Sequence, residues 1–85
     1  MKAVEEVGVA LAELSMLGAD DFQIRGAWAL FLKGSRDPLP SIAEVQLNPR
    51  SYAAIRDRWE IAAGELFSVI RTPSGGEIRL FVVKG

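Results

Sequence analysis

The sequence lacks both cysteine and histidine. Without cysteine the chain has no disulfide, and no thiolate can serve as a nucleophile or a metal ligand. Without histidine it has neither the commonest general base nor the commonest transition-metal ligand, and the side chain that usually titrates near neutral pH is missing. We therefore expect no catalytic residue, no metal site and no cofactor, and the sequence predicts that the protein is not an enzyme.

Long apolar runs and export signals are missing as well. No stretch approaches the ~20 apolar residues that span a bilayer, and Lys2 is followed by two glutamates rather than by a continuous apolar segment. A chain without cysteine and without such signals fits a reducing compartment. We expect a cytoplasmic protein that does not bind membranes.

Short motifs that carry chemistry are weak. Gly75-Gly76 lies between two predicted strands, whereas a phosphate-binding loop joins a strand to a helix. Asp20 and Asp21 are adjacent, so their carboxylates point in different directions and suit a corner of the chain better than a cation site. We expect structural roles for these residues.

What the sequence does contain is the composition of one small folded domain. About half of the 85 residues are apolar (49%) and a quarter are charged (25%), which is ordinary for a globular protein. A chain of this size buries roughly 60–65% of its unfolded surface and has a free energy of unfolding of about 4–13 kcal/mol. We expect a single domain that spans residues 1–85.

Charge is unevenly distributed along the chain. Residues 1–24 carry one basic and five acidic side chains, a net charge of −4, whereas residues 25–85 carry nine basic and six acidic side chains, a net charge of +3. The overall charge of −1 gives no bulk basicity of the kind that indicates nucleic-acid binding. The asymmetry has two interpretations, chance in a small chain or a functional acidic element on a mildly basic body.

Residues 3–17 have the clearest helical pattern. Apolar residues recur there at three- and four-residue spacing and form one stripe, which consists of Val4, Val7, Leu11 and Leu14. Two glutamates in the first turn suit the helix dipole, and Gly18 is the expected left-handed cap.

Residues 21–33 fit two patterns. Apolar residues on alternate positions favour a long strand with a bulge or bend at Gly26, and these residues are Phe22, Ile24, Trp28, Leu30 and Leu32. Helical spacing is also matched, by Ile24, Ala27, Trp28 and Phe31. We favour the strand, because on a helix the apolar residues would spread around the whole circumference and Gly26 would weaken its middle.

The remainder of the chain predicts a loop, a strand, a helix and a hairpin. Residues 34–41 are rich in proline, glycine and serine, and residues 42–47 alternate apolar and polar side chains. Asn48 and Pro49 are a strong helix start, and the helix is expected to run to about Ala63. Its expected core face consists of Tyr52, Ile55, Trp59 and Ala62.

The hairpin consists of strands at residues 66–72 and 77–84 around a turn that contains two glycines. If Thr72 pairs with Glu77, then Ile70, Arg79 and Phe81 share one face. The complete order is α-β-β-α-β-β, and the predicted fold is an α+β two-layer sandwich with two helices and a mainly antiparallel sheet. The link from residues 42–47 through the second helix to the hairpin would fit a right-handed crossover.

Two apolar surfaces suggest a function in protein binding. The first helix carries a second apolar row opposite its core stripe, which consists of Val9, Ala12 and Met16 and is bordered by Glu5 and Glu13. The expected contacts on this helix are Val9, Ala12, Glu13 and Met16. The hairpin offers Ile70, Arg79 and Phe81. We expect a non-catalytic subunit, adaptor or inhibitor, of the kind that phages and accessory genes encode, whose partner is another protein or a second copy in a homodimer.

The alternative is a nucleic-acid-binding or transcription-regulatory domain that uses Arg50, Arg56 and Arg58 on the second helix. Arginines near a helix start can follow a phosphate backbone. The acidic residues among them neutralise much of this charge, so protein binding is the favoured interpretation.

Overall fold

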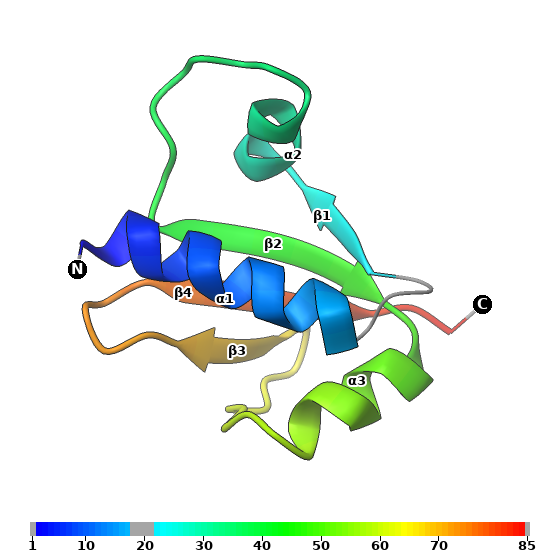
Figure 1. The fold of residues 1–85 in the computed structure, drawn as a ribbon. Helices are drawn as coiled ribbons and strands as arrows, with labels where there is room; N and C mark the ends of the chain where they lie inside the picture. The colour runs from blue at the N-terminus through cyan, green and yellow to red at the C-terminus, as the bar shows by residue number, and fades with distance from the viewer. Residues whose placement is uncertain (1, 18–21, 85) are drawn as a thin grey trace.

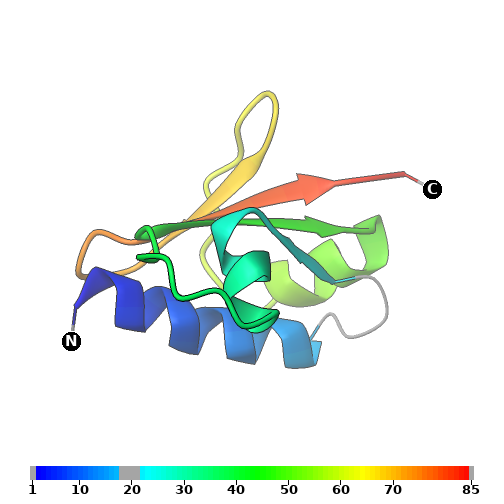
Figure 2. The same ribbon diagram turned by 90° about the horizontal axis from the view of Figure 1, so that it is seen from above.

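The computed structural model describes residues 2–17 and 22–84. Within these residues the chain forms three helices and four strands, which are α1 (Ala3–Leu17), β1 (Gln23–Arg25), α2 (Ala27–Leu32), β2 (Ile42–Leu47), α3 (Pro49–Arg56), β3 (Ser68–Arg71) and β4 (Glu77–Val82). The helices lie on one side of the sheet, and the segment that precedes β3 projects on the other side (Figures 1 and 2). The prediction of a small α+β fold is confirmed, whereas the element order is not.

The sheet is mixed rather than mainly antiparallel. Its strand order is β1-β2-β4-β3, in which the outer pairs are antiparallel and the central pair, β2 and β4, is parallel. Two parallel strands need a long connection between them. Here the chain passes from β2 through α3 and β3 before it enters β4, so β4 can run in the same direction as β2 (Figure 1). The predicted antiparallel character is correct only for the two edges.

The segment that we predicted as a long strand is divided between a strand and a helix. β1 ends at Arg25, Gly26 follows with a φ of 70°, and α2 begins at Ala27. Trp28 anchors α2, because its ring is buried and its Nε1 donates a hydrogen bond to the carbonyl oxygen of Pro40 at 3.1 Å. The glycine adopts a φ that other residues avoid, and this change of backbone conformation ends the strand and precedes the helix.

The core lies between α1 and the inner face of the sheet. Of the predicted stripe on α1, Val7, Leu11 and Leu14 are at most 3% exposed and Val4 is partly buried against them; Ala10 joins the core as well. The sheet contributes alternate residues of its strands, which are Ala43, Val45, Leu47, Ile70, Ile78 and Leu80. The predicted cap, Gly18, lies outside the described residues.

Helix α3 begins as the sequence predicts but ends earlier. The Asn48 side chain accepts a hydrogen bond from the Ser51 amide at 2.8 Å, and Pro49 occupies the first turn. The helix stops at Arg56 instead of continuing to about Ala63. The chain leaves the helix there and Ala62 forms an isolated antiparallel bridge with Val69, which covers part of the β3 edge.

The hairpin register differs by one residue from the predicted one. Arg71, not Thr72, pairs with Glu77, and Ile70 pairs with Ile78 on the core side. The turn takes up Thr72, whose hydroxyl accepts a hydrogen bond from the Gly76 amide at 2.8 Å. Because a one-residue shift moves a side chain to the other face, the predicted grouping of Ile70 with Arg79 and Phe81 is wrong.

Candidate protein-binding surface

The outer row of α1 is exposed, as the helical pattern predicts. Val9 and Met16 are 50% and 82% exposed, and Ala12 and Glu13 are exposed beside them. Helical geometry produces this arrangement, because the residues that face the sheet recur at positions three and four apart and leave a second row on the opposite side. The structure therefore brings Val9, Ala12, Glu13 and Met16 together on one face.

A groove runs along one side of α1. It consists of two adjoining hollows of about 260 and 520 Å³ that share Glu13 and Trp59. The α1 wall contains Glu6, Val9, Ala10, Glu13, Met16 and Leu17, and the opposite wall contains Arg58, Trp59, Arg71, Thr72 and Pro73. We call these two hollows together the Trp59 groove. It gives the predicted α1 row an apolar floor with charged borders.

A second hollow, of about 380 Å³, lies between α1 and α2. Its lining is almost wholly apolar and includes Leu11 and Ala12 from α1 and Trp28, Phe31 and Leu32 from α2. The side chains of Leu30, Phe31 and Leu32 are 55%, 46% and 67% exposed. Sequence reasoning missed these three as surface residues because it favoured a strand. The helical spacing of the same segment was the available signal, since one short helix cannot bury a continuous apolar run on a single side.

The predicted hairpin residues are separated by the sheet. Ile70 is 2% exposed and belongs to the core, so it cannot contribute to a binding surface. Arg79 and Phe81 lie on the opposite face, which we call the open face because no described helix covers it (Figure 2). The α1 row and the two hairpin residues therefore lie on opposite sides of the sheet and cannot form one continuous surface.

The open face combines paired charges with packed aromatic rings. The rings of Phe67 and Phe81 lie 5.3 Å apart between centroids, and the Arg79 guanidinium sits 5.1 Å above the Phe67 ring. The Nε of Arg79 also donates to the Glu77 carboxylate at 2.7 Å. Arg79 thus covers part of the aromatic surface and has its own charge balanced, which suits this face to water.

The three arginines of the nucleic-acid alternative do not form a row. Arg50 lies in the first turn of α3, whereas Arg56 ends the helix with its guanidinium 5.9 Å from the centre of the Tyr52 ring. Arg58 lies beyond the helix and lines the Trp59 groove. A common helical face for Arg50 and Arg58 required the longer helix that the structure does not contain.

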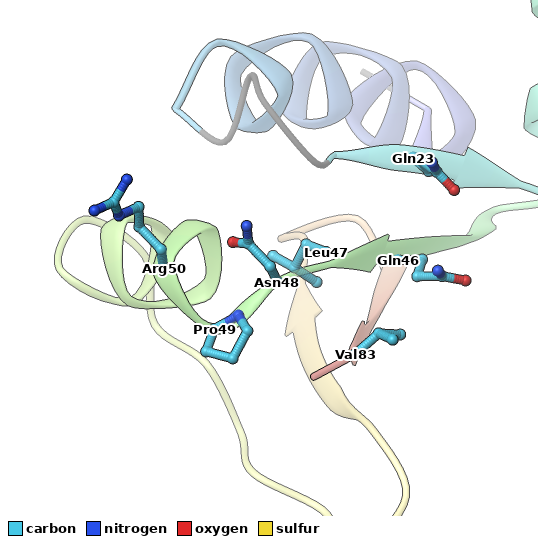
Figure 3. A pocket seen from close by; sticks show the side chains of 7 residues that line it. All are labelled: Gln23, Gln46, Leu47, Asn48, Pro49, Arg50 and Val83. Atoms are coloured by element: carbon cyan, nitrogen blue, oxygen red, sulfur yellow. The ribbon is translucent and has the colours of Figure 1, made fainter. Parts of the chain in front are cut away.

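A polar hollow lies where β2 and β4 end. Side chains from β1, β2, the start of α3 and the residue after β4 surround it, and they are Gln23, Gln46, Leu47, Asn48, Pro49, Arg50 and Val83 (Figure 3). The lining contains amides and one guanidinium, but neither a carboxylate nor a nucleophilic side chain. This arrangement can donate and accept hydrogen bonds, and its own side chains supply no acid–base pair.

One carboxyl group is electrostatically perturbed by the fold. The backbone amide of Ser74 donates a hydrogen bond to the Glu6 carboxylate at 2.8 Å, and this bond lowers the pKa of Glu6 below its ordinary value. The contact ties the turn between β3 and β4 to the first turns of α1. It fixes one end of the Trp59 groove.

The described residues offer no metal site and no unsatisfied buried polar group. In residues 2–17 and 22–84, no group of three or more carboxylates is placed to hold a metal ion, and every buried side-chain nitrogen or oxygen has a hydrogen-bond partner. No helix of that part of the chain is long and apolar enough to cross a bilayer. No family model matches the chain, and neither a curated protein nor a solved structure matches it.

Proposed function

We propose that this protein is a small binding module that acts through an exposed apolar surface on its helices. This surface, which we call the helical face, consists of Val9, Ala12 and Met16 from α1 and Leu30, Phe31 and Leu32 from α2. The observation that carries the proposal is the exposure of its five large apolar side chains, which ranges from 46% to 82%.

Leaving this apolar surface in water costs free energy. Transfer of apolar area out of water contributes about 25 cal/mol per Å², and contiguous apolar patches on small proteins commonly mark interaction sites. The hollow between α1 and α2 can receive side chains of a partner, and Phe31 at its border is the kind of aromatic residue that contributes strongly to binding.

Charge and composition support contact rather than catalysis. Glu5 and Glu13 lie on α1 beside the helical face, where they would favour a partner with basic side chains. The chain contains neither of the side chains most often used as base or soft nucleophile, because it has no histidine and no cysteine. The protein would therefore act as a subunit, adaptor or inhibitor that occupies the surface of a larger protein.

Affinity capture from the source cell, with bound proteins identified by mass spectrometry, tests the proposal. We expect the variant with Val9→Arg and Met16→Glu to lose a partner that the wild type retains, because both charges would have to be buried in the contact. Leu66→Glu is the matched control. Leu66 is 85% exposed, close to Met16 at 82%, but it lies in the segment that projects on the other side of the sheet.

Two further measurements define the surface. Phe31→Glu examines the part formed by α2, and Phe81→Glu examines the open face. Retention of every captured protein by the α1 variant and by Phe31→Glu, with native circular dichroism, would contradict the proposal. Loss of capture in Phe81→Glu alone would move the contact to the open face.

A further inference from the structure

The Trp59 groove has walls of opposite charge. Glu6 and Glu13 lie on the α1 wall, and Arg58 and Arg71 lie on the wall across from it. This local division follows the charge asymmetry of the chain, because residues 1–24 carry a net charge of −4 and residues 25–85 a net charge of +3. The groove therefore presents an acidic and a basic border along the same apolar floor.

Within residues 2–17 and 22–84, the charged side chains at the middle of the groove have no ion-pair partner. Among the residues that the structure describes, the ion pair joins Glu77 to Arg79, and Glu13, Arg58 and Arg71 form none. The side chains of these three residues are exposed. They are available to a second molecule that presents the same charges in the reverse order.

A second copy of this chain presents that order. A two-fold axis parallel to α1 and running along the groove lays the acidic wall of one copy over the basic wall of the other, and the reverse contact forms at the same time. Glu13 then faces Arg58 and Arg71 of the second copy. An axis perpendicular to α1 would instead stack α1 on α1 and oppose the two acidic walls, which costs free energy.

The apolar side chains fit the same arrangement. Val9 and Met16 stand on the acidic wall, and Trp59 is half-buried between the two hollows. When the α1 row of each copy inserts into the groove of the other, the Trp59 side chain of one copy covers Val9 and Met16 of the other. Tryptophan and arginine are the residues that most often dominate protein interfaces.

We infer that the Trp59 groove is a self-association surface, in which two copies dock through α1 about a two-fold axis parallel to that helix. This inference rests on the proposed function, because it names the occupant of the α1 part of the helical face. Leu30, Phe31 and Leu32 lie on the other side of α1 and stay outside the two-fold contact. They remain accessible to a different protein.

Sedimentation velocity on the purified chain, from micromolar to millimolar concentration, tests this inference. The wild type is expected to form a dimer, and Glu13→Arg and Arg58→Glu are each expected to raise its Kd at least about tenfold, since two-fold symmetry makes each change create like-charge contacts at two places in the dimer. The double variant restores opposite charges and is expected to recover most of the affinity. Asp37→Arg and Arg36→Glu are matched controls, because both residues are exposed and neither lines the groove.

Engineered cysteines test the direction of the axis. The native chain has no cysteine, so Met16→Cys and Arg58→Cys each introduce a single reactive site. In an oxidised mixture of the two variants we expect the mixed disulfide to form faster than either homodimer. Faster formation of the Met16→Cys homodimer would indicate stacking of α1 on α1 and overturn the proposed geometry.

Other outcomes also overturn the inference. A wild type that is monomeric over the whole range would do so, as would a dimer whose Kd is unchanged by both single charge reversals. These results are distinguishable from failure of the proposed function. A monomeric chain that captures a different protein, and loses it with Val9→Arg and Met16→Glu, retains the proposed function without self-association.

Discussion

The helical face and the open face both meet solvent, but they treat their apolar side chains differently. On the open face, Phe67 and Phe81 pack together and the guanidinium of Arg79 lies over one ring. On the helical face, Phe31 packs edge-on against Trp28 with the ring centroids 6.2 Å apart, but Met16 and Leu32 remain 82% and 67% exposed. The strands of the open face therefore cover their aromatic rings, whereas the helical face leaves several large apolar side chains exposed; on the open side, Leu66 in the segment before β3 is also 85% exposed.

The sheet explains part of the difference. Neighbouring strands place side chains of one face opposite each other, so Glu44 lies between Arg25 and Arg79 in the register of β1, β2 and β4. Opposite charges alternate across that row. Helices α1 and α2 have no equivalent register, because each is fixed by the row that it buries and the outward row is unconstrained by the fold. This contrast supports the proposal that the helical face is the surface that contacts a partner.

The largest expected effect on the free energy of unfolding comes from comparing the buried and exposed rows of α1. Leu14→Ala should lower the free energy of unfolding by about 2–5 kcal/mol, because Leu14 is 0% exposed and its truncation leaves a cavity beneath the helix. Met16→Ala, two residues later on the exposed row, should change the same quantity by less than about 0.5 kcal/mol. Urea denaturation followed by circular dichroism measures both. Equal losses would mean that Met16 also supports the fold, and the helical face would then be smaller than proposed.

An intermediate effect compares the two solvent-facing surfaces directly. Phe81→Ala should cost about 1–2 kcal/mol of unfolding free energy, since it removes the ring that packs against Phe67. Leu32→Ala should cost at most about 0.5 kcal/mol, because Leu32 is already 67% exposed. Thermal and urea unfolding of both variants gives the values. A greater loss for Leu32→Ala would contradict the distinction between the faces.

The smallest expected effect concerns Glu6 at the end of the Trp59 groove. The Ser74 amide lowers the pKa of Glu6 from its ordinary value of 4.5 in the folded state, so this contact stabilises the fold above that value. The contribution is lost as the pH falls through the lower folded pKa. The Tm difference between wild type and Glu6→Gln should therefore be largest near neutral pH and shrink in acid. Glu5→Gln is the control, since it removes the same charge from the same turn without removing the Ser74 contact.

The sequence predicted those elements whose pattern is local. The core stripe of α1 and the start of α3 at Asn48 and Pro49 were correct, because helical periodicity and capping depend on residues a few positions apart. The exposed row of Val9 and Met16 follows from the same periodicity. The exposed position of the predicted α1 contact residues could therefore be predicted without a structure. Their role in binding stays a proposal.

The predictions that were wrong concern elements whose structure depends on contacts between residues distant in the sequence. Trp28 anchors α2 through Pro40, and the bridge between Ala62 and Val69 forms where the chain has left α3. The hairpin register is set by the turn around Gly76, where a Cβ atom would lie 2.6 Å from the Val7 side chain of α1. No local pattern encodes such approaches. For this reason the separation of Ile70 from Phe81 was missed. For α2 the helical spacing of Ala27, Trp28 and Phe31 was a local signal, but the alternating pattern of the same segment competed with it.

By itself the sequence determined the chemistry that the side chains can offer and the two faces of α1, because composition and periodicity are properties of the chain alone. The tertiary structure decided which surfaces are continuous. It placed α2 beside α1, turned Ile70 into the core and set Arg58 and Arg71 across from Glu13. Proximity between distant segments results from packing of the whole chain, and the groove between them exists only once that packing is complete.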